Sequence, residues 1–64
     1  MSSVIRTFHY DPAEKALIVT FRTGKRYAYS GVPAEVVSAL RSAASLGTFF
    51  NAAIRDHYPF ERLR

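Results

Sequence analysis

The sequence predicts an α+β fold, in which a three-stranded antiparallel meander packs against two short C-terminal helices (β-β-β-α-α). The first half of the chain contains three runs rich in β-branched, apolar or aromatic residues at strand spacing. The loops between these runs are too short for parallel crossovers, so the strands must be antiparallel. The second half repeats apolar residues at helical spacing, and such helices need the sheet as an apolar partner.

The three strands are expected at Val4–Tyr10, Ala16–Arg22 and Lys25–Tyr29. Asp11-Pro12 opens the first turn, because proline fixes φ and the Asp carboxylate can accept a nearby backbone N–H. Gly24 suits the second turn, since glycine tolerates positive φ. Side chains alternate across a strand, so one face should carry an apolar set toward the helices. That set is Leu17, Val19, Phe21, Tyr27 and Tyr29.

The first helix is expected at Pro33–Ala44, where proline fits the first turn because its missing N–H is not needed there. Ser45 is suited to cap the N-terminus of a second helix. That helix should end before Tyr58-Pro59, because proline disfavours helix at the residue before it. Residues Phe60–Arg64 are then expected to form a docked or frayed tail.

Length and composition indicate one small basic domain, residues 1–64. The chain has nine Lys and Arg residues and five Asp and Glu residues, and the resulting net charge of +4 favours contact with polyanions such as nucleic acids. The chain has no Cys, which excludes disulfides and cysteine-ligated zinc. It shows no signal peptide and no apolar run of about 18 residues, so a cytoplasmic protein without a membrane partner is expected.

The residues argue against catalysis. His9 and His57 are the only histidines, and neither belongs to a metalloprotease motif such as H-E-x-x-H. The sequence also contains no Gly-rich phosphate-binding loop. No cysteine nucleophile is available, and the five carboxylates form no close pair in the sequence. We therefore expect no enzymatic activity, no metal site and no cofactor.

Tyr27 and Tyr29 lie directly after two cations, Lys25 and Arg26. Aromatic rings beside cations can hold an unpaired base next to its phosphate, which makes these four residues candidates for nucleic-acid binding. The alternative is that both tyrosine rings line the core, with their hydroxyls hydrogen-bonded near the sheet edge. A domain this short of core material favours the second interpretation.

The remaining candidates are polar. Arg22 joins Lys25 and Arg26 around the Thr23-Gly24 turn, and the three could form a phosphate-binding surface on the hairpin and the outer face of the sheet. They could also be solvated charges that protect the sheet edge. Asn51 and Arg55 are four residues apart and share one helix face. They are candidates for a ligand contact, or Asn51 could cap backbone groups and Arg55 could pair with an acid such as Asp11 or Glu35.

Taken in order, these residues resemble the KTSC domain. The similarity runs through Tyr10-Asp11, the Leu17-x-Val19-x-Phe21 strand, Gly24-x-x-Tyr27-x-Tyr29-x-x-Val32-Pro33, and Ala44-Ser45-x-Gly47-x-Phe49-Phe50-Asn51-x-x-Ile54-Arg55. The family is named for its place at the C-terminus of some lysyl-tRNA synthetases, and it also occurs as small bacterial and phage proteins. The resemblance implies a role with RNA, suggested by the synthetase context, and brings no catalytic residues.

The sequence therefore predicts a non-catalytic module that binds RNA or another single-stranded nucleic acid through a basic surface. The alternative is a module for protein interaction or homo-oligomerisation, in which an exposed edge of the Val4–Tyr10 or Lys25–Tyr29 strand pairs with another chain. Ile18 on the outer face and the tail residues Phe60 and Leu63 favour this alternative. A phage or prophage accessory role fits both.

Overall fold

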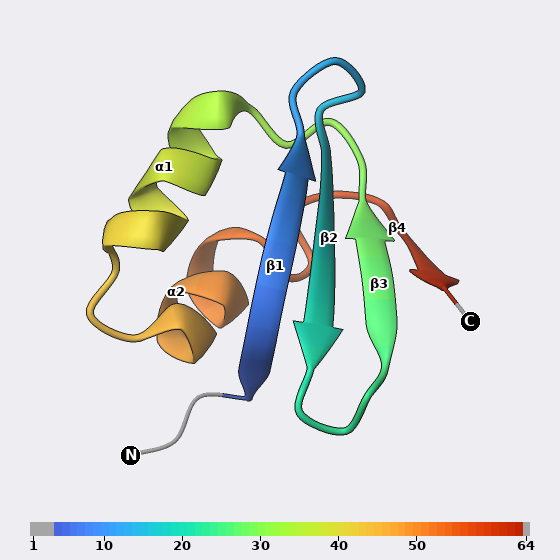
Figure 1. The fold of residues 1–64 in the computed structure, drawn as a ribbon. Helices are drawn as coiled ribbons and strands as arrows, with labels where there is room; N and C mark the ends of the chain where they lie inside the picture. Colours follow the sequence, from blue (N-terminus) through green and yellow to red (C-terminus); the bar gives the residue numbers. More distant parts are fainter. Residues whose placement is uncertain (1–3, 64) are drawn as a thin grey trace.

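A computed structural model describes residues 4–63, which form one antiparallel sheet with two helices on one of its faces (Figure 1). The strands lie in the order β1-β2-β3-β4. Their bounds are β1 Ile5–Asp11, β2 Ala16–Phe21, β3 Arg26–Tyr29 and β4 Phe60–Leu63, and the helices are α1 Ala34–Ser42 and α2 Leu46–Ala53. The α+β class, the antiparallel sheet and the two helices are confirmed, but the sheet has four strands and not three.

The fourth strand is the segment that the sequence predicted to be a tail. β4 pairs antiparallel with β3, so that Phe60 lies opposite Tyr29 and Leu63 lies opposite Arg26. The backbone N–H of Ser30 donates to the carbonyl of Pro59 at 2.9 Å and extends this pairing. In a four-residue strand with two charged residues, the alternation of apolar and polar side chains is too short to distinguish a strand from a solvated tail. Since β4 covers β3, the Lys25–Tyr29 strand is not the exposed edge that the sequence suggested.

The turns form as their residues dictate. Asp11 Oδ1 accepts hydrogen bonds from the N–H groups of Ala13 at 3.1 Å and Glu14 at 3.4 Å. Gly24 closes the β2–β3 turn with φ of 91°, a conformation that other residues adopt only with strain. Both hairpins are therefore fixed locally, before any tertiary contact is considered.

α2 begins directly after the expected cap residue, whereas α1 begins one residue later than predicted, because Pro33 is its extended N-cap and not part of its first turn. Pro33, with φ of −72°, immediately precedes α1, and the Ser45 hydroxyl caps α2 by accepting from the N–H of Thr48 at 3.3 Å. α1 ends at Ser42, two residues before the predicted end, because Ala43 turns to an extended conformation with ψ of 141°. This early end allows the chain to reverse into α2.

The core lies between the helices and the face of the sheet that they cover, which we call the inner face. Leu17 and Val19 of β2 have no solvent exposure, and Leu40 of α1 has none either. Phe8 and Tyr10 of β1 pair with these β2 positions and lie on the same face. Buried side chains that complete the core are Ile5, Tyr29, Val32, Val37, Phe50 and Ile54.

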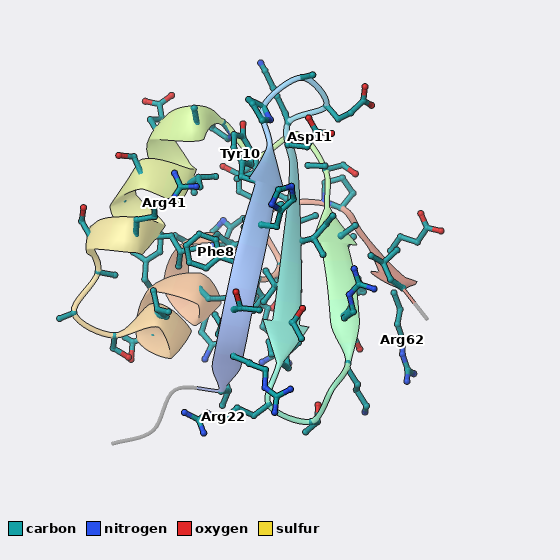
Figure 2. The ribbon with its side chains drawn as sticks, in the orientation of Figure 1. Phe8, Tyr10, Asp11, Arg22, Arg41 and Arg62 are labelled. Carbon is teal, nitrogen blue, oxygen red and sulfur yellow. The ribbon has the colours of Figure 1, made fainter. Side chains whose placement is uncertain are left out.

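Val32 joins the first hairpin to the segment before α1. Its carbonyl accepts a hydrogen bond from the Tyr10 hydroxyl at 2.7 Å, and its N–H donates to the carbonyl of Lys15 at 3.0 Å. Figure 2 shows Tyr10 on the helix side of β1, together with Phe8, whose ring centre lies 5.8 Å from the guanidinium carbon of Arg41. The entry to α1 is thus fixed against β1 and the β1–β2 turn.

We expect the substitution Tyr10→Phe to lower the free energy of unfolding by about 1 kcal/mol, because it removes one partly buried hydrogen bond and leaves the ring in place. In a domain of this size the melting temperature should fall by about 4–8 °C. Urea denaturation measures the change. Tyr58→Phe, which removes a hydroxyl from another partly buried tyrosine, is the control, and an equal loss in both variants would contradict the assignment.

Candidate functional site: a groove between the sheet and α2

A groove of about 610 Å³ opens between α2 and the inner face of the sheet at β2, β3 and β4. Both helices lie toward the β1 side of the sheet, so this part of the inner face is not fully covered (Figure 1). The volume lies within the range of small-molecule binding sites, about 300–1,000 Å³. It is therefore the candidate site of this protein.

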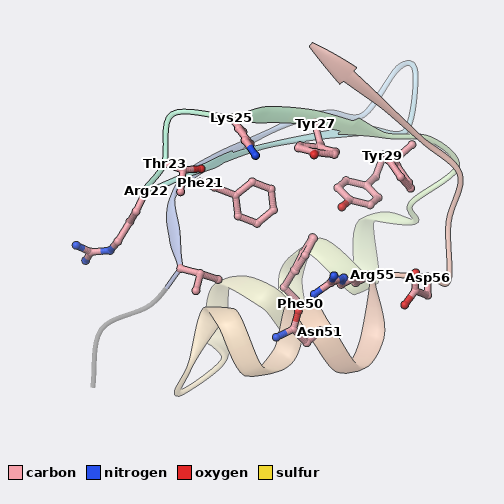
Figure 3. A pocket seen from close by; sticks show the side chains of 12 residues that line it. Phe21, Arg22, Thr23, Lys25, Tyr27, Tyr29, Phe50, Asn51, Arg55 and Asp56 are labelled. Atoms are coloured by element: carbon pink, nitrogen blue, oxygen red, sulfur yellow. The ribbon is translucent and has the colours of Figure 1, made fainter. Parts of the chain in front are cut away.

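Aromatic rings form most of the apolar surface of the groove. Phe21, Tyr27 and Tyr29 extend from the sheet toward Phe50 on α2 (Figure 3). The ring centres of Phe21 and Phe50 are 5.6 Å apart, and those of Tyr29 and Phe50 are 5.3 Å apart, both at steep interplanar angles. Such edge-to-face contacts are favourable for aromatic pairs. Phe50 is therefore the point at which α2 is packed against the sheet.

Phe60 extends this aromatic surface onto β4. Its ring centre lies 5.5 Å from that of Tyr27 and 5.6 Å from that of Tyr29. The three rings differ in exposure, since Tyr29 is only 4% exposed, Tyr27 is half-buried and Phe60 is 56% exposed. Tyr27 and Phe60 are thus the rings that a ligand can reach, and the buried ring of Tyr29 packs against both of them.

Polar side chains lie at the two ends of the groove. Arg22, Thr23 and Lys25 come from the β2–β3 hairpin at one end, and Asp56 follows α2 at the other (Figure 3). Asn51 of α2 and Arg55, which follows the C-cap of α2, lie across the groove from the sheet. The groove therefore combines an aromatic surface with three cations, one amide and one carboxylate.

The structure brings together six of the seven residues predicted from the sequence. Those that line the groove are Arg22, Lys25, Tyr27, Tyr29, Asn51 and Arg55. Arg26 lies opposite Thr20 on the outer face, because neighbouring residues of a strand point to opposite sides. The prediction that Arg22, Lys25 and Arg26 share a surface on the outer face is therefore wrong. Arg22 and Lys25 line the groove on the inner face of the sheet.

The two tyrosines differ in their role in the core, and the side chains of Asn51 and Arg55 lack, within residues 4–63, the structural partners that the sequence suggested. Tyr29 is a core residue, as the sequence favoured, whereas Tyr27 contributes to both the core and the groove surface. Arg55 forms no ion pair with Asp11 or Glu35, and no described residue is hydrogen-bonded to the Asn51 or Arg55 side chain. Asn51 and Arg55 are exposed, so both side chains are available to a ligand.

Two groove residues that are assigned a role below, Phe60 and Asp56, were not among the site residues predicted from the sequence. Phe60 was not found because β4 was taken as a tail, and Asp56 because it follows α2 in a turn with φ of 66°. No local signal distinguished β4 from a tail, so Phe60 could be placed on the groove only through the pairing of β4 with β3.

Burial raises the pKa of the Tyr29 hydroxyl above its ordinary value, and the nearby Arg55 guanidinium partly opposes this shift. Tyr27 and Asp56 add to the increase. Arg55 and Asp56 therefore both lie close enough to the Tyr29 hydroxyl to influence its charge.

Within residues 4–63, no group of three or more His, Asp and Glu side chains is placed to hold a metal ion. The helices of the described chain are too short to cross a membrane.

The sequence matches the KTSC domain family over residues 1–58. This protein belongs to the KTSC family. An uncharacterised protein of Stutzerimonas stutzeri is 44% identical to this KTSC chain over 63 residues, which are 97% of this chain and 89% of the other. A protein of Tsukamurella paurometabola is 40% identical over 57 residues, which cover 89% of this chain and 85% of the other.

A solved structure extends the comparison. The crystal structure of a KTSC domain protein from Yersinia pestis superposes with a TM-score of 0.93 at 32% identity and covers 100% of this chain and 92% of the other. The family match ends at residue 58, whereas the structural likeness extends over β4. The KTSC fold is thus shared over the whole groove.

The raised pKa of Tyr29 predicts a loss of stability at alkaline pH. Above about pH 10 the unfolded chain releases the Tyr29 proton while the folded KTSC domain retains it, so the unfolded state is favoured. The contribution of Tyr29 is therefore complete below that pH and is lost as pH rises through the folded-state pKa. Urea denaturation from about pH 9 to about pH 11 should show a steeper loss in the native protein than in Tyr29→Phe. Parallel curves would contradict this assignment.

Proposed function

We propose that this KTSC protein is a non-catalytic module that binds single-stranded nucleic acid, preferably RNA, in the groove between the sheet and α2. The observation that carries the proposal is that one groove gathers three cations and two accessible aromatic rings. Single-stranded nucleic acids are bound by this combination, because cations contact the backbone and rings stack on bases. A cytoplasmic location, where RNA is available, is part of the proposal.

Base stacking is assigned to Tyr27 and Phe60. Their ring centres are 5.5 Å apart with an interplanar angle of 43°, so the two rings form a continuous but tilted surface. Phe60 is more than half exposed and can accept a base without displacing core side chains. Tyr29 is too deeply buried to stack on a base, and its role is to hold Tyr27 and Phe60 in place.

Phosphate contacts are assigned to Lys25 and Arg55, with Arg22 at the hairpin end of the groove. Lys25 and Arg55 come from opposite sides of the groove, and a backbone that passes between them can contact both. The net charge of +4 adds a general attraction to polyanions. With three phosphates neutralised, the logarithm of affinity should fall with the logarithm of salt concentration at a slope of about −2.

The proposed function is tested by titrating the protein with single-stranded RNA, single-stranded DNA and duplex DNA at two salt concentrations. We expect the single strands to bind more tightly than the duplex, because stacking on Tyr27 and Phe60 requires unpaired bases. Affinity that does not change with salt, or a preference for duplex, would contradict the proposal.

The alternative function, protein interaction or homo-oligomerisation, depends on the sheet edges at β1 and β4, since β4 covers β3. Light scattering on the same samples decides between the two. A stable oligomer together with no binding to any polyanion would favour the alternative.

We expect Lys25→Glu to weaken the binding of single-stranded RNA by about tenfold near physiological salt and to reduce the magnitude of the salt slope by about 0.7. The physical reason is that the substitution removes a cation from the groove and adds a charge that repels phosphate. Arg26→Glu is the matched control, because it changes the net charge equally on the adjacent residue but on the outer face. Equal losses in the two variants would show that the groove has no special role.

We expect Phe60→Leu to weaken binding by about 5- to 150-fold, which corresponds to the loss of about 1–3 kcal/mol of stacking on one base. Phe60→Tyr keeps the ring and should retain the affinity. Because Phe60 is 56% exposed, both variants should remain folded, which thermal denaturation checks. If Phe60→Leu binds like the native protein, stacking on Phe60 is excluded.

A further inference from the structure

The two ends of the groove differ in charge. The hairpin end carries the cations Arg22 and Lys25, whereas the other end carries the carboxylate of Asp56 next to the cation Arg55. β3 separates these ends, and its four residues correspond to a length of about 13 Å. A bound strand therefore meets a carboxylate only at the Asp56 end, and the nucleotide group beside that carboxylate must differ from the phosphates that contact the cations.

The backbone at Asp56 is fixed by hydrogen bonds on both sides. The N–H of Arg55 donates to the carbonyl of Phe50 at 2.8 Å, and the N–H of His57 donates to the carbonyl of Ile54 at 3.0 Å. Asp56 itself has φ of 66°, a left-handed conformation that Asp and Asn adopt more readily than most residues. The turn therefore places this carboxylate at the groove, close enough to the Tyr29 hydroxyl to influence it electrostatically.

A carboxylate at this point selects the group that it contacts. It repels phosphate, and when ionised it can only accept hydrogen bonds. The neutral donors of a nucleotide are the base amines and imino groups and the sugar hydroxyls. A base that stacks on Tyr27 and Phe60 presents its face to the protein, and the sugar links that base to the phosphates near Lys25 and Arg55.

We infer that Asp56 accepts a hydrogen bond from the ribose 2′-hydroxyl of a nucleotide in the groove, and that the groove thereby distinguishes RNA from DNA. The inference rests on the proposed function, and it assigns to Asp56 a role in selecting the sugar. The 2′-hydroxyl is the group by which proteins tell the two nucleic acids apart, and a charged acceptor makes a stronger hydrogen bond to it than a neutral one.

The test compares oligouridylate with oligodeoxyuridylate, which differ only in the 2′-hydroxyl and carry a base without an exocyclic amine. We expect the native protein to bind the RNA form about fivefold more tightly, which corresponds to about 1 kcal/mol. In Asp56→Asn this ratio should fall toward one. The affinity for the DNA form should rise, because the variant no longer repels phosphate. Asn tolerates the same positive φ, so the turn is kept.

Glu61→Gln is the matched control. It removes the same charge from β4, but Glu61 lies opposite Ala28 and therefore on the outer face. The control should raise affinity for both oligonucleotides slightly and leave their ratio unchanged. A native protein that binds both equally, or an Asp56→Asn variant that keeps the native ratio, would overturn the role of Asp56 and leave the proposed function standing. If neither oligonucleotide binds, the proposed function fails and the inference fails with it.

Discussion

The contact of Phe50 with Phe21 and Tyr29 holds the two halves of this domain together. α1 and α2 have nine and eight residues, and isolated helices of that length are not stable in water. No disulfide is possible in a chain without cysteine. The helices therefore depend on burial against the sheet, and Phe50 is the largest side chain that the core encloses almost completely. The same contact sets the distance between α2 and β3, and thus the width of the groove.

Much of this fold could be predicted from local sequence signals. The alternation in Ala16–Phe21, the Asp11 and Gly24 turns, Pro33 before α1 and the Ser45 cap each act over a few residues, and the structure contains all of them. β4 lacks such a signal. Its four residues are mostly exposed, and what makes them a strand is the hydrogen-bonding edge of β3, which only the folded chain presents.

The candidate site was likewise predictable only where local sequence signals existed. Residue type indicated the cations and tyrosines, and six of the predicted residues line the groove. The shared helix face expected for Asn51 and Arg55 was wrong, because α2 ends at Ala53 and Arg55 follows its C-cap Ile54. What residue type could not give was the side of the sheet. Lys25 and Arg26 are both cations, so residue type does not distinguish them. Lys25 lines the groove, whereas Arg26 lies on the outer face of the sheet. Phe60 and Asp56 became recognisable only when β4 and the turn after α2 were placed.

The pairing of β4 with β3 also bears on the order in which the domain folds. The β1–β2 and β2–β3 hairpins join neighbouring segments, whereas β3 and β4 are separated in the sequence by both helices. Closing the longer loop costs more chain entropy, so the local hairpins should form early and β4 should dock late. A strand that is mostly exposed should also be among the first elements to open in the native state. The aromatic surface that Phe60 completes should therefore form after the two hairpins, so that an intact groove marks a chain that has finished folding.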